Sequence, residues 1–202
     1  MKRWMGWLLC LLTFGQVRAA GNEWLDRLQR AVEALGAYEV QFDISAMNDY
    51  ATTGFYRVDG ERYWMEMPDM RVYCDGKARY EINDRTEEVV IDAVQTQSRN
   101  LLDNPVRAFD FVGEQYAVEQ LAETAEHPGQ VTLRLTPRSA AGAAGATIDL
   151  TIDKRTALPV MVIYAAEDVQ IRVRISSFAK SSTAFPAFRK ADFPDYEWID
   201  FR

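Results

Sequence analysis

Apolar and polar side chains alternate along most of this chain, and the alternation limits the folds that it can adopt. The clearest run is residues 38–44, in which every second side chain is apolar. A period of two is typical of a strand with one face against an apolar core and the other in water. Similar short runs follow at residues 55–58, 62–67, 70–74, 78–82 and 88–91. Turn sequences such as Asp59-Gly60 and Asp75-Gly76 separate them, which predicts an antiparallel meander.

The remainder adds helical segments and a second group of strands. Asn22 is a good N-cap, and the apolar spacing after it predicts an amphipathic helix at residues 23–35 that Gly36 closes. Helical spacing returns at residues 98–113. Further strands are expected at residues 116–123, 131–137, 147–152, 159–165 and 169–178, with a Gly/Ala-rich hairpin loop at 139–146. The expected fold class is α+β, mainly β, without the βαβ alternation of nucleotide-binding folds.

The first nineteen residues have the features of a secretory signal peptide. Lys2 and Arg3 precede an apolar run at residues 4–14, which is shorter than the roughly 20 residues that cross a bilayer. Small or modest side chains at Val17 and Ala19 predict cleavage after Ala19, against the alternative of an uncleaved anchor. We therefore expect an exported, periplasmic protein with one domain, residues 20–202.

Charge and cysteine content exclude several classes of partner. The chain has 23 basic and 30 acidic residues, and the predicted cleavage removes three basic residues and no acid, which takes the formal charge from −7 to −10. Nucleic acid and anionic membranes are poor partners for such a chain. Only Cys74 remains after cleavage, so no intramolecular disulfide is expected.

The sequence contains few residues that could support catalysis. His127 is the single histidine and lies in a turn sequence, while Cys74 lacks a second cysteine or a nearby histidine to activate it. The acidic pairs at residues 87–88 and at 195 and 197 are interpreted as solvated carboxylates. We expect no enzyme activity, no metal and no cofactor.

The predicted inward positions are rich in methionine and aromatic residues, which adapt to apolar guests of variable shape. An ordinary core filled by the same side chains is the alternative. The candidate lining of an apolar cavity is Tyr38, Val40, Phe42, Ile44, Phe55, Tyr63, Met65, Met67, Met70, Leu101 and Phe109, and Met47 belongs to the same predicted surface.

Several segments together resemble the outer-membrane lipoprotein carrier family, LolA. They are the N-terminal amphipathic helix, the strand at 38–44, and the stretches at 54–58, 63–68 and 72–77; the closing residues 193–202 are similar to LolA-like proteins of Bacteroidetes. The resemblance implies an unclosed half-barrel of about ten to eleven antiparallel strands with a helical lid over its concave apolar face. It also implies a monomeric carrier of acylated lipoproteins, which receives them from an inner-membrane releasing complex and passes them to an outer-membrane acceptor.

One feature of the family is missing from this sequence. Proteobacterial members have an arginine beside a proline that hydrogen-bonds the lid, whereas residues 58–62 here contain no Arg-Pro pair. Arg62 is the preferred candidate for a lid latch, and Arg57 is the alternative.

Two other functions remain open at this point. LolA-like domains also occur in periplasmic sensors of lipids or lipoproteins, and an apolar cleft also suits a hydrolase or isomerase. The expected cleft offers almost no converging polar groups, which argues against an enzyme. The sequence ends directly after the expected half-barrel, whereas sensors of this kind usually have a further domain, so the carrier is preferred.

Overall fold

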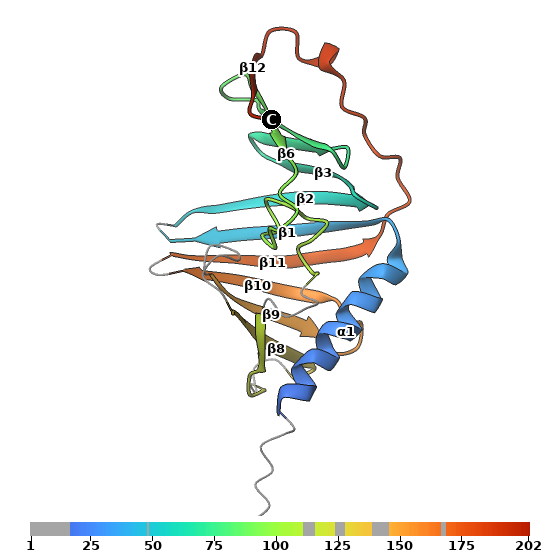
Figure 1. Ribbon diagram of the computed structural model, residues 1–202, viewed down its shortest axis with the longest axis vertical. Coiled ribbons are helices and arrows are strands. Elements are labelled where there is room, and N and C mark those ends of the chain that lie inside the picture. Colours follow the sequence, from blue (N-terminus) through green and yellow to red (C-terminus); the bar gives the residue numbers. More distant parts are fainter. Residues whose placement is uncertain (1–16, 48, 111–115, 124–127, 139–145, 167–168) are drawn as a thin grey trace, which may run out of the picture.

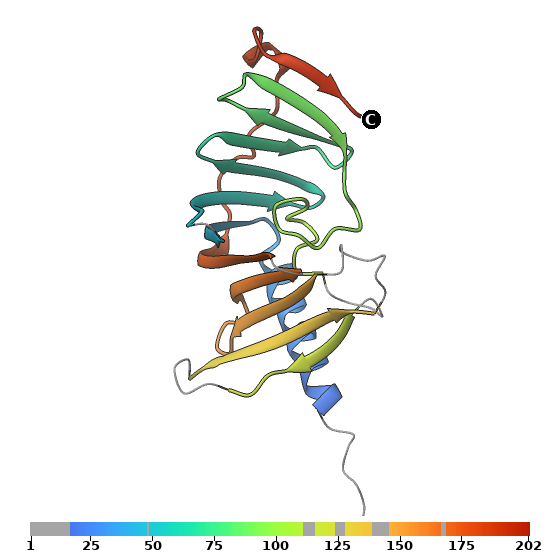
Figure 2. The same ribbon diagram turned by 90° about the vertical axis from the view of Figure 1, so that its left-hand side faces the viewer.

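The computed structural model describes residues 17–47, 49–110, 116–123, 128–138, 146–166 and 169–202. One twelve-stranded sheet dominates them, in the order β12-β6-β5-β4-β3-β2-β1-β11-β10-β9-β8-β7. The strands are β1 (Tyr38–Ala46), β2 (Ala51–Asp59), β3 (Arg62–Met67), β4 (Met70–Cys74), β5 (Ala78–Asn83), β6 (Glu88–Ala93), β7 (Tyr116–Gln120), β8 (Gln130–Pro137), β9 (Thr147–Asp153), β10 (Pro159–Ala166), β11 (Val169–Lys180) and β12 (Glu197–Asp200). Figures 1 and 2 show the strands stacked along the long axis of an open, curved sheet.

β1 lies at the centre and joins two halves that are distant in the sequence. It pairs antiparallel with β2 on one side and with β11 on the other. The meander β2–β6 forms one half, and the later strands β7–β11 form the other in reverse order. The expected single, unclosed, mainly antiparallel sheet is confirmed. Its strand spans follow the alternation closely, because a period of two fixes which side chains reach the core.

The helix α1 (Val17–Leu35) crosses the half of the sheet built from the later strands (Figure 1). It begins before the predicted N-cap, so Asn22 lies inside the helix and the prediction of a start at residue 23 was wrong. Ala19 and Ala20 are strong helix formers and extend it. Gly36 has a φ of +68° and ends the helix, as predicted. No helix within the described ranges is long and apolar enough to cross a membrane.

The second predicted helix does not form in the described part of residues 98–113. Residues 98–110 make successive turns instead, with hydrogen bonds from Asp103 N to Asn100 O and from Arg107 N to Asn104 O, each 3.1 Å. Pro105 has no N–H to donate and disfavours helical backbone at Asn104. The Asn100 side chain accepts from Leu102 N at 2.9 Å, which competes with helical pairing. We call residues 98–110 the plug.

The apolar face of the sheet changes sides at β5. We define the inner face as the one that carries Val40 and contacts α1 and the plug, and the outer face as its opposite. On β4 Val72 points inward, but its partner on β5 is Glu81, while Tyr80 and Ile82 point outward. A second small core therefore forms on the outer face, where Ile82 and Val89 pack with Phe193.

The C-terminal segment covers this outer core. Phe188 stacks on Tyr80 with ring centroids 4.2 Å apart, and Trp198 packs against the ring of Phe188. The chain then adds β12, which pairs parallel with β6. This strand was missed in the sequence because it has four residues and its partner is about a hundred residues away.

The described residues leave the sequence prediction of a signal peptide untested. Residues 1–16, His127 and most of the expected hairpin loop at 139–146 lie outside the described ranges. Cleavage after Ala19 stays a prediction, and its site would lie in the first turn of α1.

Gly54 on β2 faces the ring of Phe42 so closely that a Cβ there would overlap it and lie 3.0 Å from Met67 Cγ. Gly54→Ala is expected to destabilise the fold by about 1–3 kcal/mol, because Phe42 is fully buried and has no room to move. Urea unfolding measures the change, with Thr53→Ala on the outer face as the control. An unchanged midpoint for Gly54→Ala would contradict this account of the packing.

Asp84 links the β4–β5 hairpin to the C-terminal segment. Hydrogen bonding from Arg71 lowers the pKa of Asp84 below its ordinary value of 3.8, and Tyr196 Oη also donates to this carboxylate at 2.9 Å. A lowered folded-state pKa means that the ionised group stabilises the folded protein above the unfolded-state pKa, and that this contribution disappears as pH falls through the folded-state pKa.

Asp84→Asn is therefore expected to lower the urea midpoint at neutral pH, and the difference from the parent protein should shrink on acidification. Asp69→Asn, in the neighbouring exposed turn, serves as the control. A difference that persists unchanged at acid pH would argue against a role for the charge.

Candidate functional site

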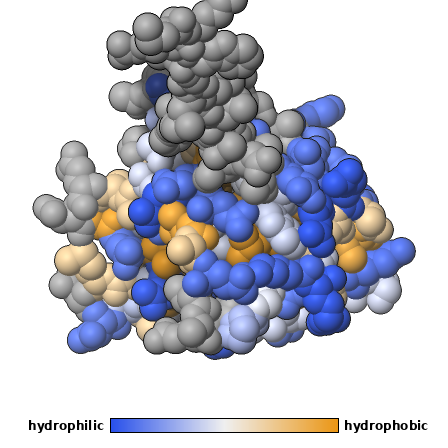
Figure 3. All heavy atoms as spheres, turned by 90° about the horizontal axis from the view of Figure 1, so that it is seen from below, coloured by the Kyte–Doolittle hydropathy of each residue, from blue (hydrophilic) through white to orange (hydrophobic). Residues whose placement is uncertain are grey.

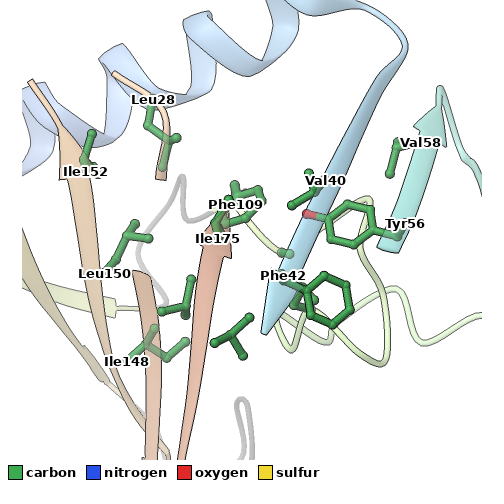
Figure 4. Packing of buried hydrophobic residues seen from close by; sticks show 14 of the residues in the cluster. Leu28, Val40, Phe42, Tyr56, Val58, Phe109, Ile148, Leu150, Ile152 and Ile175 are labelled. Atoms are coloured by element: carbon green, nitrogen blue, oxygen red, sulfur yellow. The ribbon is translucent and has the colours of Figure 1, made fainter. Parts of the chain in front are cut away.

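The inner face of the sheet forms one continuous apolar cluster across both halves. Phe42, Tyr56 and Met65 on the early strands and Leu133 and Leu150 on the later ones are at most 1% exposed. Figure 4 shows side chains from β1, β2, β9 and β11 converging beneath α1. An apolar surface of this extent on a single sheet requires a cover, since no second sheet packs against it in the described chain.

Most of the predicted lining residues lie in this cluster. Tyr38, Val40, Phe42, Ile44, Tyr63, Met65, Leu101 and Phe109 are buried in it, and Met67 and Met70 are partly buried against it. The structure therefore brings ten of the eleven together, as packed side chains and not as the wall of an empty cavity.

Two residues of the predicted surface lie elsewhere. Phe55 is on the outer face, where its ring packs edge-on against Trp64 at 5.5 Å, and its neighbour Tyr56 is the one that points inward. Reading β2 one residue out of register exchanges its faces, and the inward spacing of Gly54, Tyr56 and Val58 is the signal that was missed. Met47 is 56% exposed at the end of β1.

The protein's own chain covers the inner face. Leu28 of α1 is fully buried over it, and Phe109 of the plug lies beside it (Figure 4). The plug also contributes Leu101 and Ala108. Seen from the end at which α1 begins, hydrophobic residues appear only in small patches among hydrophilic ones (Figure 3). The described residues visible at this end in Figure 3 do not form one continuous hydrophobic surface.

Two tyrosines attach the plug to the two halves of the sheet. Tyr63 Oη of β3 donates to Asp103 O at 3.1 Å. Tyr164 Oη of β10 donates to Arg99 O at 3.3 Å and accepts from Leu101 N at 3.1 Å. Burial raises the pKa of both hydroxyls well above 10, so they remain protonated donors at neutral pH.

Arg99 folds the plug onto itself. Its guanidinium contacts Asp110 O, and Nη2 lies 3.7 Å from the Asp110 carboxylate, while Nη1 donates to Gln97 O at 3.4 Å. The side chain is 9% exposed. This buried arginine joins both ends of the plug, and nothing in the sequence pattern distinguished it.

The predicted latch residues lie on the outer face. Arg62 pairs with Asp59, and its guanidinium lies 5.2 Å from the ring centroid of Phe185. Arg57 pairs with Glu39 at 3.2 Å and donates to Ala184 O at 3.1 Å. The prediction that Arg62 reaches the lid was wrong, because alternation along β2 and β3 directs both arginines away from the plug.

An open cavity of about 370 Å³ lies beside the plug, at the end of the sheet away from Tyr38. Its apolar lining is Ala146, Ile148, Tyr164, Ala166, Val169 and Ile171, and plug residues 98–100 and 103 with Gln97 form its polar side. None of the predicted lining residues reaches it. A larger hollow of about 510 Å³ lies on the outer face, where Arg172, Arg174 and Thr132 stand beside apolar side chains such as Met161 and Ile163.

The candidate nucleophile of this chain has a structural position. Cys74 is buried on the inner face, and burial raises the pKa of its thiol, so a nucleophilic thiolate is disfavoured. The described residues contain no cluster of three or more His, Cys, Asp or Glu side chains that could hold a metal.

No family model and no curated protein matches the sequence. Solved structures do match. An uncharacterized conserved protein from Thermus thermophilus has a TM-score of 0.56 at 13% identity, with 90% of this chain and 99% of that chain covered. A LolA superfamily protein from Nitrosomonas europaea has a TM-score of 0.42 at 9% identity, with 86% and 96% covered. A chain of the Pseudomonas aeruginosa MucA/MucB complex has 0.38 at 19% identity, with 85% and 60% covered.

An unclosed sheet with a helix across its concave face is the architecture that the resemblance implied and the one that the structure has. The chain shares its fold with the uncharacterized conserved protein from Thermus thermophilus. At these identities the likeness concerns the fold alone, and the similarity of residues 193–202 to Bacteroidetes proteins stays a prediction.

Tyr164→Phe is expected to loosen the plug, because it leaves Leu101 N–H without its acceptor. An unsatisfied buried donor costs about 1–3 kcal/mol, so exchange of the Leu101 amide hydrogen should accelerate by about tenfold or more. Tyr80→Phe, on the outer face, is the matched control. Equal exchange rates in both variants would show that Tyr164 does not hold the plug.

Proposed function

We propose that this chain is a periplasmic carrier that binds the acyl chains of lipoproteins on its inner face and passes them from the inner to the outer membrane. The observation that carries the proposal is the plug: a segment without helix or strand covers part of a continuous apolar face, beside an open apolar cavity. Such a cover can leave without breaking a helix or a sheet ladder.

The energetics of this exchange favour reversible binding. An acyl chain gains about 0.8 kcal/mol for each methylene that it buries. Entry past the plug removes Leu101 and Phe109 from the same apolar face, which costs energy of the same kind. The net free energy of binding is the difference between this gain and this cost, which are similar in size. A carrier that must release its cargo requires such a small difference.

The open cavity provides the entrance. Its volume of about 370 Å³ lies near the lower end of ligand sites, which span roughly 300–1,000 Å³. Additional room for a long acyl chain comes from displacement of the plug. Tyr63 and Tyr164 are the polar groups that this displacement releases, and both are hydroxyl groups that water can solvate at little cost.

Ala166 lines the cavity on β10, so Ala166→Trp is expected to fill the entrance and weaken binding of a fluorescent acyl probe by about tenfold or more. Ile163→Trp on the outer face of the same strand is the matched control and should leave probe binding unchanged. Circular dichroism and urea unfolding check that both variants fold. Equal binding by the parent and Ala166→Trp would place the ligand elsewhere or remove the proposal.

The cargo is identified by mass spectrometry of what co-purifies when the full chain is expressed with export to the periplasm. Intact acylated lipoprotein supports the carrier. Free lipid without lipoprotein contradicts the carrier and indicates a lipid sensor instead. Recovery of neither, together with no displaceable probe, would mean that the inner face is only a core.

A further inference from the structure

Three exposed apolar side chains lie at neighbouring strand ends on one side of the sheet (Figure 1). Four large hydrophobic residues are exposed in the described chain: Met47, Tyr50 and Val169, each 56% exposed, and Phe201, 69% exposed. Met47 and Tyr50 lie at the tip of the β1–β2 hairpin, and Val169 begins β11. The two hairpin ends are neighbours, because Ala46 pairs with Ile171 and its N–H donates to Tyr50 O at 3.0 Å. Figure 1 shows both at the left of the sheet.

This apolar rim, defined as Met47, Tyr50 and Val169, borders the open cavity. Val169 lines the cavity itself, and Ile171 next to it forms part of the same wall. Phe201 lies beyond β12, at the edge strand six positions from β1 in the sheet. One of the four exposed hydrophobic side chains, Val169, thus lines the candidate site, and Met47 and Tyr50 lie on the neighbouring hairpin.

We propose that the apolar rim docks onto the surface of a zwitterionic lipid bilayer, so that an acyl chain passes between bilayer and cavity without crossing water. This inference rests on the proposed function, which gives the docking its purpose. The evidence for it is the position of the rim. Each methylene that crossed water would carry a hydrophobic cost, which contact between rim and bilayer removes.

The size of the rim favours a bilayer over a protein partner. A stable interface between proteins buries about 800 Å² on each partner, roughly 20–30 residues, and three side chains at two hairpin tips offer far less. Shallow insertion needs only a few apolar groups. Tyrosine suits this position because its ring is apolar and its hydroxyl stays at the headgroup level.

Charge selects the type of bilayer. Asp49 is exposed between Met47 and Tyr50, and the whole chain has a formal net charge of −7. The nearest arginines of β11, Arg172 and Arg174, point to the outer face, where Arg174 pairs with Asp43. The rim therefore meets an uncharged surface more favourably than an anionic one.

The test measures partition of the full chain onto phosphatidylcholine vesicles by flotation. Combined Met47→Ser, Tyr50→Ser and Val169→Ser substitutions should reduce partition by about tenfold or more. All three positions are exposed, so the fold should persist, and Phe201→Ser is the matched control, which should partition like the parent. Failure of the parent to bind, or an equal loss with Phe201→Ser, would overturn the proposal.

Anionic vesicles test the charge argument. Replacing part of the phosphatidylcholine by phosphatidylglycerol should weaken partition of the parent, and Asp49→Asn should restore part of it. Stronger binding to the anionic vesicles would overturn the choice of a zwitterionic surface.

Transfer of an acyl probe separates this proposal from the proposed function. A double variant, Met47→Ser with Tyr50→Ser, leaves the cavity lining intact and should bind the probe in solution like the parent but release it to vesicles about tenfold more slowly. A parent that binds no probe contradicts the carrier, whereas the flotation result judges the rim without any probe. A dimeric parent that the triple substitution makes monomeric would identify a second copy as the occupant and overturn the bilayer proposal.

Discussion

The hydrophobic face of a single curved sheet is the constraint on which the rest of this structure depends. A sandwich covers such a face with a second sheet, and a closed barrel turns it inward on all sides. This chain has neither arrangement in its described residues, so α1 and the plug must supply the cover. The two covers differ in kind: α1 is a regular helix, whereas the plug is a series of turns attached through the hydroxyl groups of Tyr63 and Tyr164.

That difference separates the inner face into a part beneath α1 and a part beneath the plug, and under the proposed function only the second part exchanges its cover. Removing α1 would expose Leu25 and Leu28 and the side chains beneath them. Removing the plug costs the burial of Leu101 and Phe109 and a few hydrogen bonds, and water or an acyl chain can replace these contacts in part. The open cavity lies beside the plug, and the proposed function makes it the entrance.

The outer core at the opposite end of the sheet follows from the same constraint. Once Arg79 and Glu81 occupy the inner positions of β5, the apolar side chains of that strand are on the outer face and need a cover of their own. The C-terminal segment supplies it through Phe188 and Phe193, and then closes the edge of β6 with β12. This arrangement limits the apolar inner face to the part of the sheet that α1 and the plug overlie.

The alternation of apolar and polar residues was enough to predict the sheet, since strict alternation lets a strand present one apolar face in only one way. The spans of β3 and β4 were predicted to the residue for this reason, and ten of the eleven predicted inner side chains lie in one cluster. The prediction that Phe55 points inward was wrong because alternation fixes the faces only after the register is known. Pairing with β1 and β3 sets that register. Three features became known only from the folded chain: residues 98–110 form turns, Arg99 lies inside the plug, and β12 pairs with β6. Each of these depends on contacts between residues distant in the sequence or on local competition for backbone hydrogen bonds, and neither leaves a periodic signal in the sequence.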